Sequence, residues 1–386
     1  MLSCQRDLVH LPDGLHYLNC AYMAPLLKSA EEAGIAALRR RHDPTAIAPA
    51  DFFTGADRAR ALFAELVGGE AARVAIIPGV SYGMATVAKN VRLRAGQNVV
   101  VAHGQFPSNV YGWRRRCAEA GASLRAVAPP DAVEGWGREW NARLLEAVDA
   151  DTAVVALGNV HWADGTRFDL ERIGERAREV GAMLVVDGSQ SVGAMPFDVA
   201  RVRPDALVCA SYKWLFGPYA LSLAHYGERF DGAEPLEETW LGRRGSDDFA
   251  RLVEYEDEYR PGAARFDMAE RASIVLMPML IAALEQVLAW GPANIQAYCG
   301  ELTRGLIAEA RGLGYAVEDD AWRGAHLFGL RAPAGADPAR LQAALRERRV
   351  SVSQRGDAVR VAPHLYNTPD DVAALADALG AVRGQA

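Results

Sequence analysis

The stretch that decides the fold is MLVVDGSQSVG at residues 183–193, together with ALVCASYKWLFGP at residues 206–218. Each stretch opens with a short apolar run that is partly β-branched. Asp187 ends the first run, and Lys213 follows closely after the second. Such runs are typical of strands buried in a parallel sheet, and ligands of open α/β sheets bind outside the carboxyl ends of the strands. Both side chains are therefore candidates for a ligand site.

Apolar runs and helical patterns alternate on both sides of this stretch, from about residue 50 to residue 226. Short apolar strands between amphipathic helices indicate a mostly parallel sheet with helices on both faces. We expect further strands at 74–78, 98–102 and 153–160, and helices at 55–68, 110–120 and 171–181.

The composition changes after residue 230. The next segment is acidic, Gly-rich and irregular, and a strongly apolar helix is expected at about 273–291. The chain then alternates helix and strand again, which predicts a smaller C-terminal α/β domain. The expected division is an N-terminal segment (1–20) packed on the small domain, a large domain (21–265), a linking helix (266–293) and the small domain (294–386).

The bulk composition excludes several classes of protein. The 386 residues carry a formal net charge of −7, which argues against binding nucleic-acid phosphates. No apolar run reaches the roughly 18–20 residues of a membrane helix, and the start is too polar for a secretory signal. Five scattered cysteines indicate reduced thiols in a cytoplasmic protein. The absence of CxxC, HExxH, EF-hand and GxxxxGK(S/T) patterns argues against a dedicated metal or P-loop site.

Lysine is rare in this sequence. Of 42 basic residues only Lys28, Lys89 and Lys213 are lysines. Arginine cannot act as an amine nucleophile at ordinary pH, whereas a desolvated lysine can. Aromatic and apolar residues surround Lys213 in SYKWLF, which should lower its pKa and suits an amine that forms a Schiff base. The alternative is a lysine on a surface turn with its stem packed and its charge in water.

Three further features complete a possible cofactor site. A carboxylate at Asp187 can keep a pyridinium nitrogen protonated, and Gln190, three residues later, could reach the same ligand. The loop PGVSYGM (78–84) precedes an expected helix, whose N-terminal N–H groups can bind phosphate, and Ser81 adds a hydroxyl. Each feature alone has an ordinary structural explanation. Their order, with Lys213 placed 23 residues after Gln190, favours a cofactor site.

These motifs resemble the class V aminotransferases, which have the fold type I of pyridoxal 5′-phosphate (PLP) enzymes. The group includes cysteine desulfurases, kynureninases and isopenicillin N epimerase-like proteins. The resemblance covers nearly the whole chain and implies PLP as the cofactor, with a large PLP-binding domain and a smaller C-terminal domain. The matching segments are YLNCAYMAPL (17–26), GVSYGMA (79–85), QFPSN (105–109), VDGSQSVGAMPFDV (186–199), ASYKWLFGP (210–218) and VRVAPHLYNTPDDV (359–372).

The resemblance implies roles for the residues that match. Lys213 would form the internal aldimine and later move the Cα proton, Asp187 would pair with the pyridine nitrogen, and Gln190 would bind the phenolate oxygen. Phe106 would stack on the ring. The phosphate would be held by the residues of the loop and of the lysine motif, namely Val80 through its backbone, Ser81, Tyr212 and, as a further candidate, Ser211.

The resemblance also implies residues on the substrate side and from a second subunit. Arg360 would clamp the substrate carboxylate, and Tyr22 is a further substrate-binding candidate. His161 occupies the place of an active-site polar residue and is expected among the cofactor-binding residues. In relatives the site lies at a dimer interface, so Trp240 and the segment 266–273 would come from the neighbouring chain. Glu270 stands where desulfurases place a phosphate-binding hydroxyl, and its carboxylate would repel phosphate unless Arg271 offsets it.

The cofactor motifs leave the reaction open. We expect an enzyme that acts on an amino acid through an external aldimine, with transamination ahead of epimerisation and of C–S or C–C cleavage. An epimerase would need a second acid or base, for which His161 and Tyr22 are candidates by position. Desulfuration is disfavoured because residues 300–386 contain no cysteine. Two alternatives remain. One is a PLP-fold protein without turnover. The other is a nucleotide-binding α/β protein, although this sequence lacks the GxGxxG and Walker signatures of that class.

Overall fold

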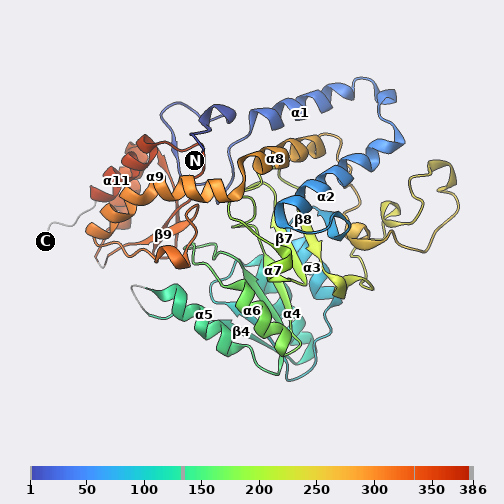
Figure 1. Ribbon diagram of the computed structural model, residues 1–386, viewed down its shortest axis with the longest axis horizontal. Coiled ribbons are helices and arrows are strands. Elements are labelled where there is room, and N and C mark those ends of the chain that lie inside the picture. The colour runs from blue at the N-terminus through green and yellow to red at the C-terminus, as the bar shows by residue number, and fades with distance from the viewer. Residues whose placement is uncertain (1, 132–134, 334, 382–386) are drawn as a thin grey trace.

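The computed structural model describes residues 2–131, 135–333 and 335–381. Within them, a seven-stranded sheet forms the centre of the molecule (Figure 1), and β2 and β7 are both antiparallel to β8 while the other neighbours are parallel. The strand order is β2 (Val74–Ile77), β8 (Ser222–Tyr226), β7 (Ala206–Ala210), β6 (Met183–Asp187), β5 (Thr152–Gly158), β3 (Asn98–Ala102) and β4 (Ser123–Val127).

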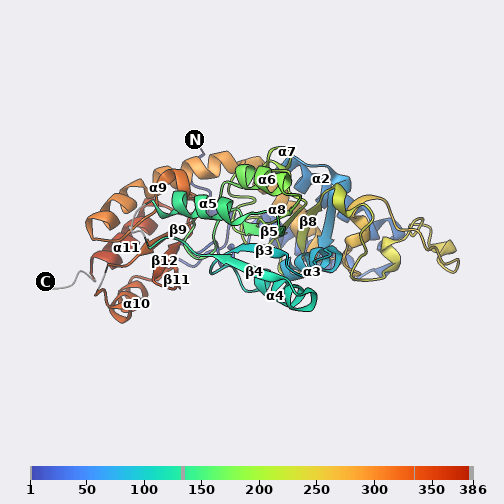
Figure 2. The ribbon, with the colours of Figure 1, turned by 90° about the horizontal axis from the view of Figure 1, so that it is seen from below.

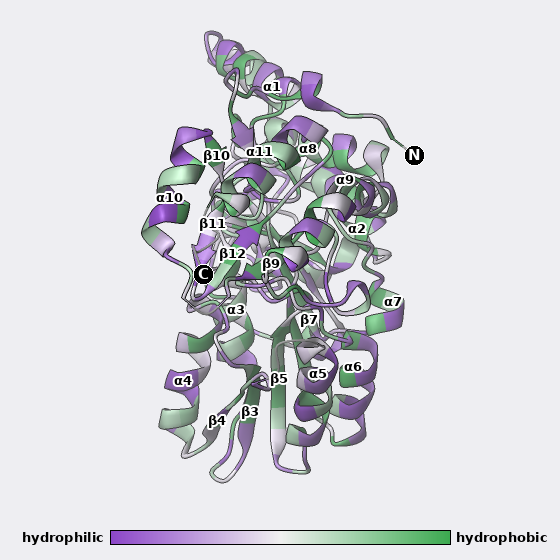
Figure 3. Ribbon diagram, turned by 90° about the vertical axis from the view of Figure 1, so that its left-hand side faces the viewer, coloured by the Kyte–Doolittle hydropathy of each residue, from purple (hydrophilic) through white to green (hydrophobic). Residues whose placement is uncertain are grey.

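Helices cover both faces of this sheet because its strands are apolar on both sides. In β6, Leu184 and Val186 belong to one core and Val185 to the other, as the twofold alternation of a strand requires. Hydrophobic strands such as β5 lie between helices with mixed surfaces (Figure 3). The first core includes α2 (Thr54–Val67), α5 (Trp136–Ala147), α6 (Leu170–Glu179) and α8 (Leu276–Trp290), and the second includes α3 (Val80–Asn90) and α4 (Ser108–Ala120).

A second sheet lies at one end of the molecule (Figure 2). Its order is β11 (Ser353–Arg355), β12 (Ala358–Val361) and β9 (Phe328–Arg331), all antiparallel. Strand β1 (His16–Tyr17) pairs in parallel with β10 (Val350–Ser351), and Leu18 belongs to the core of this end, so the N-terminal segment packs on it. The remaining helices are α1 (Lys28–Arg40), α7 (Val199–Val202), α9 (Pro292–Gly312), α10 (Pro338–Glu347) and α11 (Pro369–Gly380).

The strands expected around Asp187 and Lys213 form as predicted, and the apolar helix expected at 273–291 is α8. Residues 231–265 contain only short 3-10 helices, in keeping with the irregular segment. The domain boundaries remain predictions, and the outer ends of the first and last predicted units, residues 1 and 382–386, lie outside the described residues. No single helix among the described residues is long and apolar enough to cross a membrane, although α8 and α9 pass that test together as a pair bent by 67°.

Candidate active site

The topology brings the predicted cofactor residues to one edge of the large sheet. Strands β6 and β7 are parallel neighbours, so Asp187 and the segment after Ala210 leave the sheet at the same edge. Strand β2 runs parallel to β7 because both are antiparallel to β8, which places the loop Gly79–Ser81 at that edge too. A cavity of about 320 Å³ opens there, within the roughly 300–1,000 Å³ of small-molecule sites. It is lined by Val80, Ser81, Phe106, Trp162, Asp187, Gln190, Tyr212, Lys213 and neighbouring residues.

Lys213 presents its amine to this cavity from an apolar neighbourhood. Its Nζ lies 5.7 Å from the ring centroid of Phe106 and 5.5 Å from that of Tyr212. Burial lowers the pKa of Lys213 to about 8, while the carboxylate of Asp187 acts in the opposite direction. A substantial fraction of this amine is therefore neutral near physiological pH, which is the form that attacks an aldehyde.

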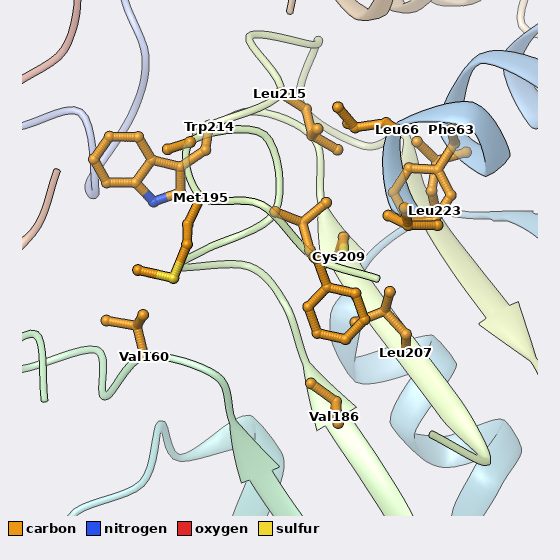
Figure 4. Packing of buried hydrophobic residues seen from close by; sticks show 14 of the residues in the cluster. Phe63, Leu66, Val160, Val186, Met195, Leu207, Cys209, Trp214, Leu215 and Leu223 are labelled. Atoms are coloured by element: carbon orange, nitrogen blue, oxygen red, sulfur yellow. The ribbon is translucent and has the colours of Figure 1, made fainter. Parts of the chain in front are cut away.

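The residues after Lys213 anchor it to the core. Trp214 and Leu215 point into a buried cluster that also contains Met195 and Cys209 (Figure 4). The indole N–H of Trp214 donates a hydrogen bond of 3.0 Å to Oε1 of Gln190. The loop that carries Lys213 is thus held by the packing of Trp214 and Leu215 in the core and by the hydrogen bond from Trp214 to Gln190.

Asp187 is oriented by two donors. The backbone N–H of Ser189 donates to Oδ1 at 2.9 Å, and the side-chain amide of Asn109 donates to Oδ2. Asn109 is buried at the start of α4, and it was not among the predicted site residues although it ends the QFPSN segment. A carboxylate accepts more than two hydrogen bonds, so Asp187 can still accept one from a protonated ring nitrogen.

Gln190 retains one donor for a ligand. Its Nε2 donates to the carbonyl of Ala21 at 3.2 Å, and its Oε1 accepts from Trp214. An amide nitrogen has two hydrogens, and Gln190 lines the cavity. The donor set therefore fits the phenolate oxygen of PLP.

The loop after β2 supplies a site for an anion. Helix α3 begins at Val80, and Val80, Ser81 and Tyr212 line the cavity. The first N–H groups of a helix have no partner within the helix, and they bind phosphate readily. The residues present therefore fit a phosphate group, and with Lys213, Asp187 and Gln190 they fit PLP as a whole.

Arg360 lies on β12 and does not itself line the cavity, although it contacts the lining residue Trp162. It is almost completely buried, and its Nη1 donates to the carbonyl of Trp162 at 2.8 Å. Its Nε and Nη2 are buried and have no hydrogen-bond partner among the described residues. Burial, followed by the charge of Arg355, lowers the pKa of Arg360 to about 10. Two unpaired N–H groups of one guanidinium are what a carboxylate requires for two-point binding.

Five of the predicted residues do not line the cavity in a single chain, namely Arg360 and the four described next. The hydroxyl of Ser211 points away from it and donates to the carbonyl of Pro218 at 2.7 Å. Nδ1 of His161 lies 3.1 Å from Asp164, and the ring packs against Trp140. Two aromatic residues lie partly in solvent instead, namely Tyr22, which is 59% exposed, and Trp240, which is 39% exposed.

The segment expected to bind phosphate from the neighbouring chain is partly engaged within its own chain. Arg271 is buried and its Nη1 donates to Asp267 at 2.7 Å, and Asp267 also pairs with Arg60. Glu270 is exposed. Arg271 is therefore held by Asp267 and is not positioned to offset the charge of Glu270.

The fold and the site together define a PLP-dependent enzyme, with a buried amine, a carboxylate and an anion-binding helix terminus around one cavity. The sequence model of the family described as aminotransferase class V matches residues 42–375. The chain belongs to the class V aminotransferase family.

Relatives in this family carry out different reactions. The chain is 25% identical over 337 residues to isopenicillin N epimerase of Streptomyces clavuligerus, covering 85% of this chain and 84% of the relative. It is 26% identical over 329 residues to the uncharacterized aminotransferase YcbU of Bacillus subtilis (strain 168), covering 84% and 82%. Both relatives are distant in sequence, and they do not share one named activity. They therefore do not select one reaction for this chain.

Solved structures share the fold over nearly the whole chain. The cystine C–S lyase C-DES, in complex with cysteine persulfide, has a TM-score of 0.84 at 19% identity and covers 96% of this chain and 98% of its own. A cysteine desulfurase from Thermococcus onnurineus NA1 has a TM-score of 0.80 at 18% identity, covering 97% of each chain. At such identity the likeness establishes the architecture, which is that of fold type I.

Proposed function

We propose that this chain is an aminotransferase in which Lys213 carries the PLP and moves the proton at the α-carbon of an amino acid. The observation that carries the proposal is the desolvated amine of Lys213 in one cavity with Asp187. Bound PLP supplies an electron sink that lowers the barrier to breaking a bond at the α-carbon. The protein's part is to hold the reacting groups and to move the proton.

The surrounding residues hold the cofactor in this proposal. Asp187, oriented by Asn109, keeps the ring nitrogen protonated, and Gln190 donates to the phenolate oxygen. Phe106, whose ring centroid lies 5.7 Å from Nζ of Lys213, would stack on the cofactor ring. The helix terminus at Val80, with Ser81 and Tyr212, binds the phosphate.

Arg360 binds the α-carboxylate of the substrate. Its two unpaired N–H groups would otherwise remain buried without partners, which is costly. Trp162, which lines the cavity and bonds to Arg360 through its carbonyl, links this cation to the site of Lys213. Proton transfer by Lys213 alone, from one face, is what transamination requires.

Epimerisation is the second candidate, because the S. clavuligerus relative is an epimerase. It needs another acid or base opposite Lys213, and neither His161 nor Tyr22 lines the cavity in a single chain. Desulfuration is further disfavoured because Cys299, the last cysteine, is buried in α9 and bonds to the carbonyl of Pro363. The geometry therefore favours transamination.

The proposed assembly is a cytoplasmic homodimer with the site at the interface. Val253 is 83% exposed and Tyr255 98%, in the segment that projects from the end opposite the second sheet (Figure 2). Trp240 is also exposed beside Phe249 in this segment. Exposed apolar side chains gathered on one segment are typical of a protein interface, so a second copy of the chain is the proposed cover.

The test is a panel of amino acids given to the PLP-loaded enzyme with a keto-acid acceptor, followed by absorbance and product analysis. We expect a new keto acid, and Lys213→Ala should reduce its rate by at least about 10²–10⁴-fold. Lys28→Ala, which changes an exposed lysine on α1, is the matched control. Retained activity in Lys213→Ala would refute the role of the lysine, whereas inverted amino acid or free ammonia in place of the keto acid would refute transamination.

A further inference from the structure

Two arginines share one face of the second sheet. In the register of β11 and β12, Ser353 lies opposite Arg360 and Arg355 lies opposite Ala358. Residues two apart in a strand point to the same side, so Arg355 and Arg360 are on one face as diagonal neighbours. Such neighbours lie about 7–8 Å apart, within reach of each other's long side chains.

A third arginine on this face has a carboxylate partner and serves for comparison. Arg331 on β9 lies opposite Ala358 and therefore points to the same side. Its Nη2 is 3.0 Å from Asp164, and its guanidinium stacks 4.0 Å from the ring of Trp136. Arg331 thus has both an anion and an aromatic partner.

Arg355 has the aromatic partner without the anion. Its guanidinium lies 5.5 Å from the ring centroid of Trp162, and its Nη1 donates to the neighbouring carbonyl of Gln354 at 2.8 Å. Its Nε is buried and lacks a partner within the part of the chain that the structure describes, as does Nε of Arg331. The difference is that no carboxylate there pairs with Arg355, whereas Asp164 pairs with Arg331. Arg355 therefore remains a cation without a counter-charge.

Trp162 connects this cation to the active site. Its ring meets that of Phe106 at 5.4 Å with an interplanar angle of 83°, and both residues line the cavity of Lys213. Its carbonyl accepts from Arg360. After burial, the charges of Arg360 and Arg355 both lower the pKa of Lys213, so both cations act on the cavity.

We propose that Arg355 binds a second anionic group on the substrate, so that the preferred substrate is an α-amino acid with a carboxylate in its side chain. The inference rests on the proposed function, in which Arg360 takes the α-carboxylate. One carboxylate satisfies one guanidinium in two-point binding. The second cation on the same face is then matched by a second carboxylate, and Trp162, which contacts both arginines, would lie beside the carbon chain between the two carboxylates.

The first experiment compares turnover of amino acids matched in size by the PLP-loaded enzyme. The pairs are aspartate with asparagine, glutamate with glutamine, and 2-aminoadipate with norleucine. The wild type should prefer the acidic member of at least one pair. Arg355→Gln should lower the acidic-to-neutral ratio of kcat/KM by about tenfold to hundredfold, mainly through KM, because a charge-assisted bond is lost. Arg355→Lys should restore part of the ratio, and the exposed Arg340→Gln on α10 should leave it unchanged.

The second experiment measures binding without turnover, by calorimetry with glutarate and butyrate on the same enzyme. Arg355→Gln should weaken glutarate alone, whereas Arg360→Gln should weaken both acids. A wild type that does not prefer glutarate, or an unchanged ratio in Arg355→Gln, would overturn the inference. If neutral amino acids are turned over and Arg355→Gln does not change the rate, the inference about Arg355 fails but the proposed aminotransferase function is retained. Binding selectivity without any amino-group transfer would defeat the proposed function instead.

Discussion

At the scale of the residue, the chemistry depends on how Lys213 is held. Its neighbours in the sequence are aromatic, and in the structure Phe106 and Tyr212 lie within 6 Å of its amine, at 5.7 and 5.5 Å. Trp214 ties the same loop to Gln190. A flexible side chain is thereby kept dry and fixed, which a nucleophilic amine needs.

This burial has a consequence for stability in the cofactor-free protein. The pKa of Lys213 is about 8 when folded against an ordinary value of 10.5. Between these two pH values the unfolded chain therefore binds more protons than the folded chain. The free energy of unfolding consequently falls as the pH drops from 10.5 to 8. Below pH 8 the amine is charged in both states, and the full cost of burying that charge remains. Cofactor-free Lys213→Met should be more stable than wild type at pH 7 by up to about 3 kcal/mol.

Denaturant unfolding of both proteins across this pH range measures the effect. The advantage of Lys213→Met should shrink as the pH rises above 8. An advantage that is constant with pH would show that packing, and not the buried charge, sets the difference.

At the scale of the element, the loop between β5 and α6 joins the two sheets. The backbone N–H of Gly329 on β9 donates to the carbonyl of Asp164 at 2.8 Å, and Arg331 pairs with the same aspartate. Gly165 has φ +79°, and an added Cβ would lie 2.2 Å from the carbonyl oxygen of Leu327. The loop that presents Trp162 to the cavity is therefore seated on the second sheet.

We expect Gly165→Ala to destabilise the protein by about 2–4 kcal/mol, because it combines a strained φ with a steric clash. It should also weaken substrate binding by displacing Trp162. Gly112→Ala is the control: a Cβ there meets nothing within 4 Å. This glycine lies inside α4, so the change should stabilise by about 0.5–1 kcal/mol. Equal effects of the two substitutions on thermal unfolding would contradict the role of the loop.

At the scale of the whole molecule, residues 231–265 expose large apolar side chains that a protein interface would bury. Val253 and Tyr255 lie in a segment without a regular helix or strand, so packing within the chain does not bury them. Tyr22 and Trp240, predicted near the cofactor, are also exposed in a single chain. One arrangement of two copies would account for both facts.

We expect the protein to sediment at twice the 41.7 kDa of one chain. Tyr255→Glu with Val253→Asp should shift it toward the monomer and reduce turnover, because charges are costly in an apolar interface. Arg346→Glu, an exposed charge reversal on α10, should leave the assembly intact. A wild-type monomer in sedimentation would refute the dimer, and a dimer unaffected by the double variant would place the interface elsewhere.

Four elements and one site residue carry no clear sequence signal, for identifiable reasons. Strand β4 is an edge strand with half-exposed residues, and Arg125 interrupts its apolar pattern. Strand β8 contains Ser222 and His225, so no apolar run marks it. Helices α1 and α5 were not expected either, although both form. Asn109 was missed because a helical asparagine carries no local sign that its partner is a carboxylate 78 residues away.

The sequence by itself determined the alternation of apolar strands and amphipathic helices, the placement of Asp187 and Lys213 after two buried strands, and the family, because these depend on local periodicity and spacing. Only the tertiary structure decided that Asn109 orients Asp187 and that Ser211 turns away from the cavity. It also decided that Arg355 stands beside Arg360. Hydrogen bonds and charges between distant segments depend on how strands align and which faces pack, and short-range patterns do not encode that alignment.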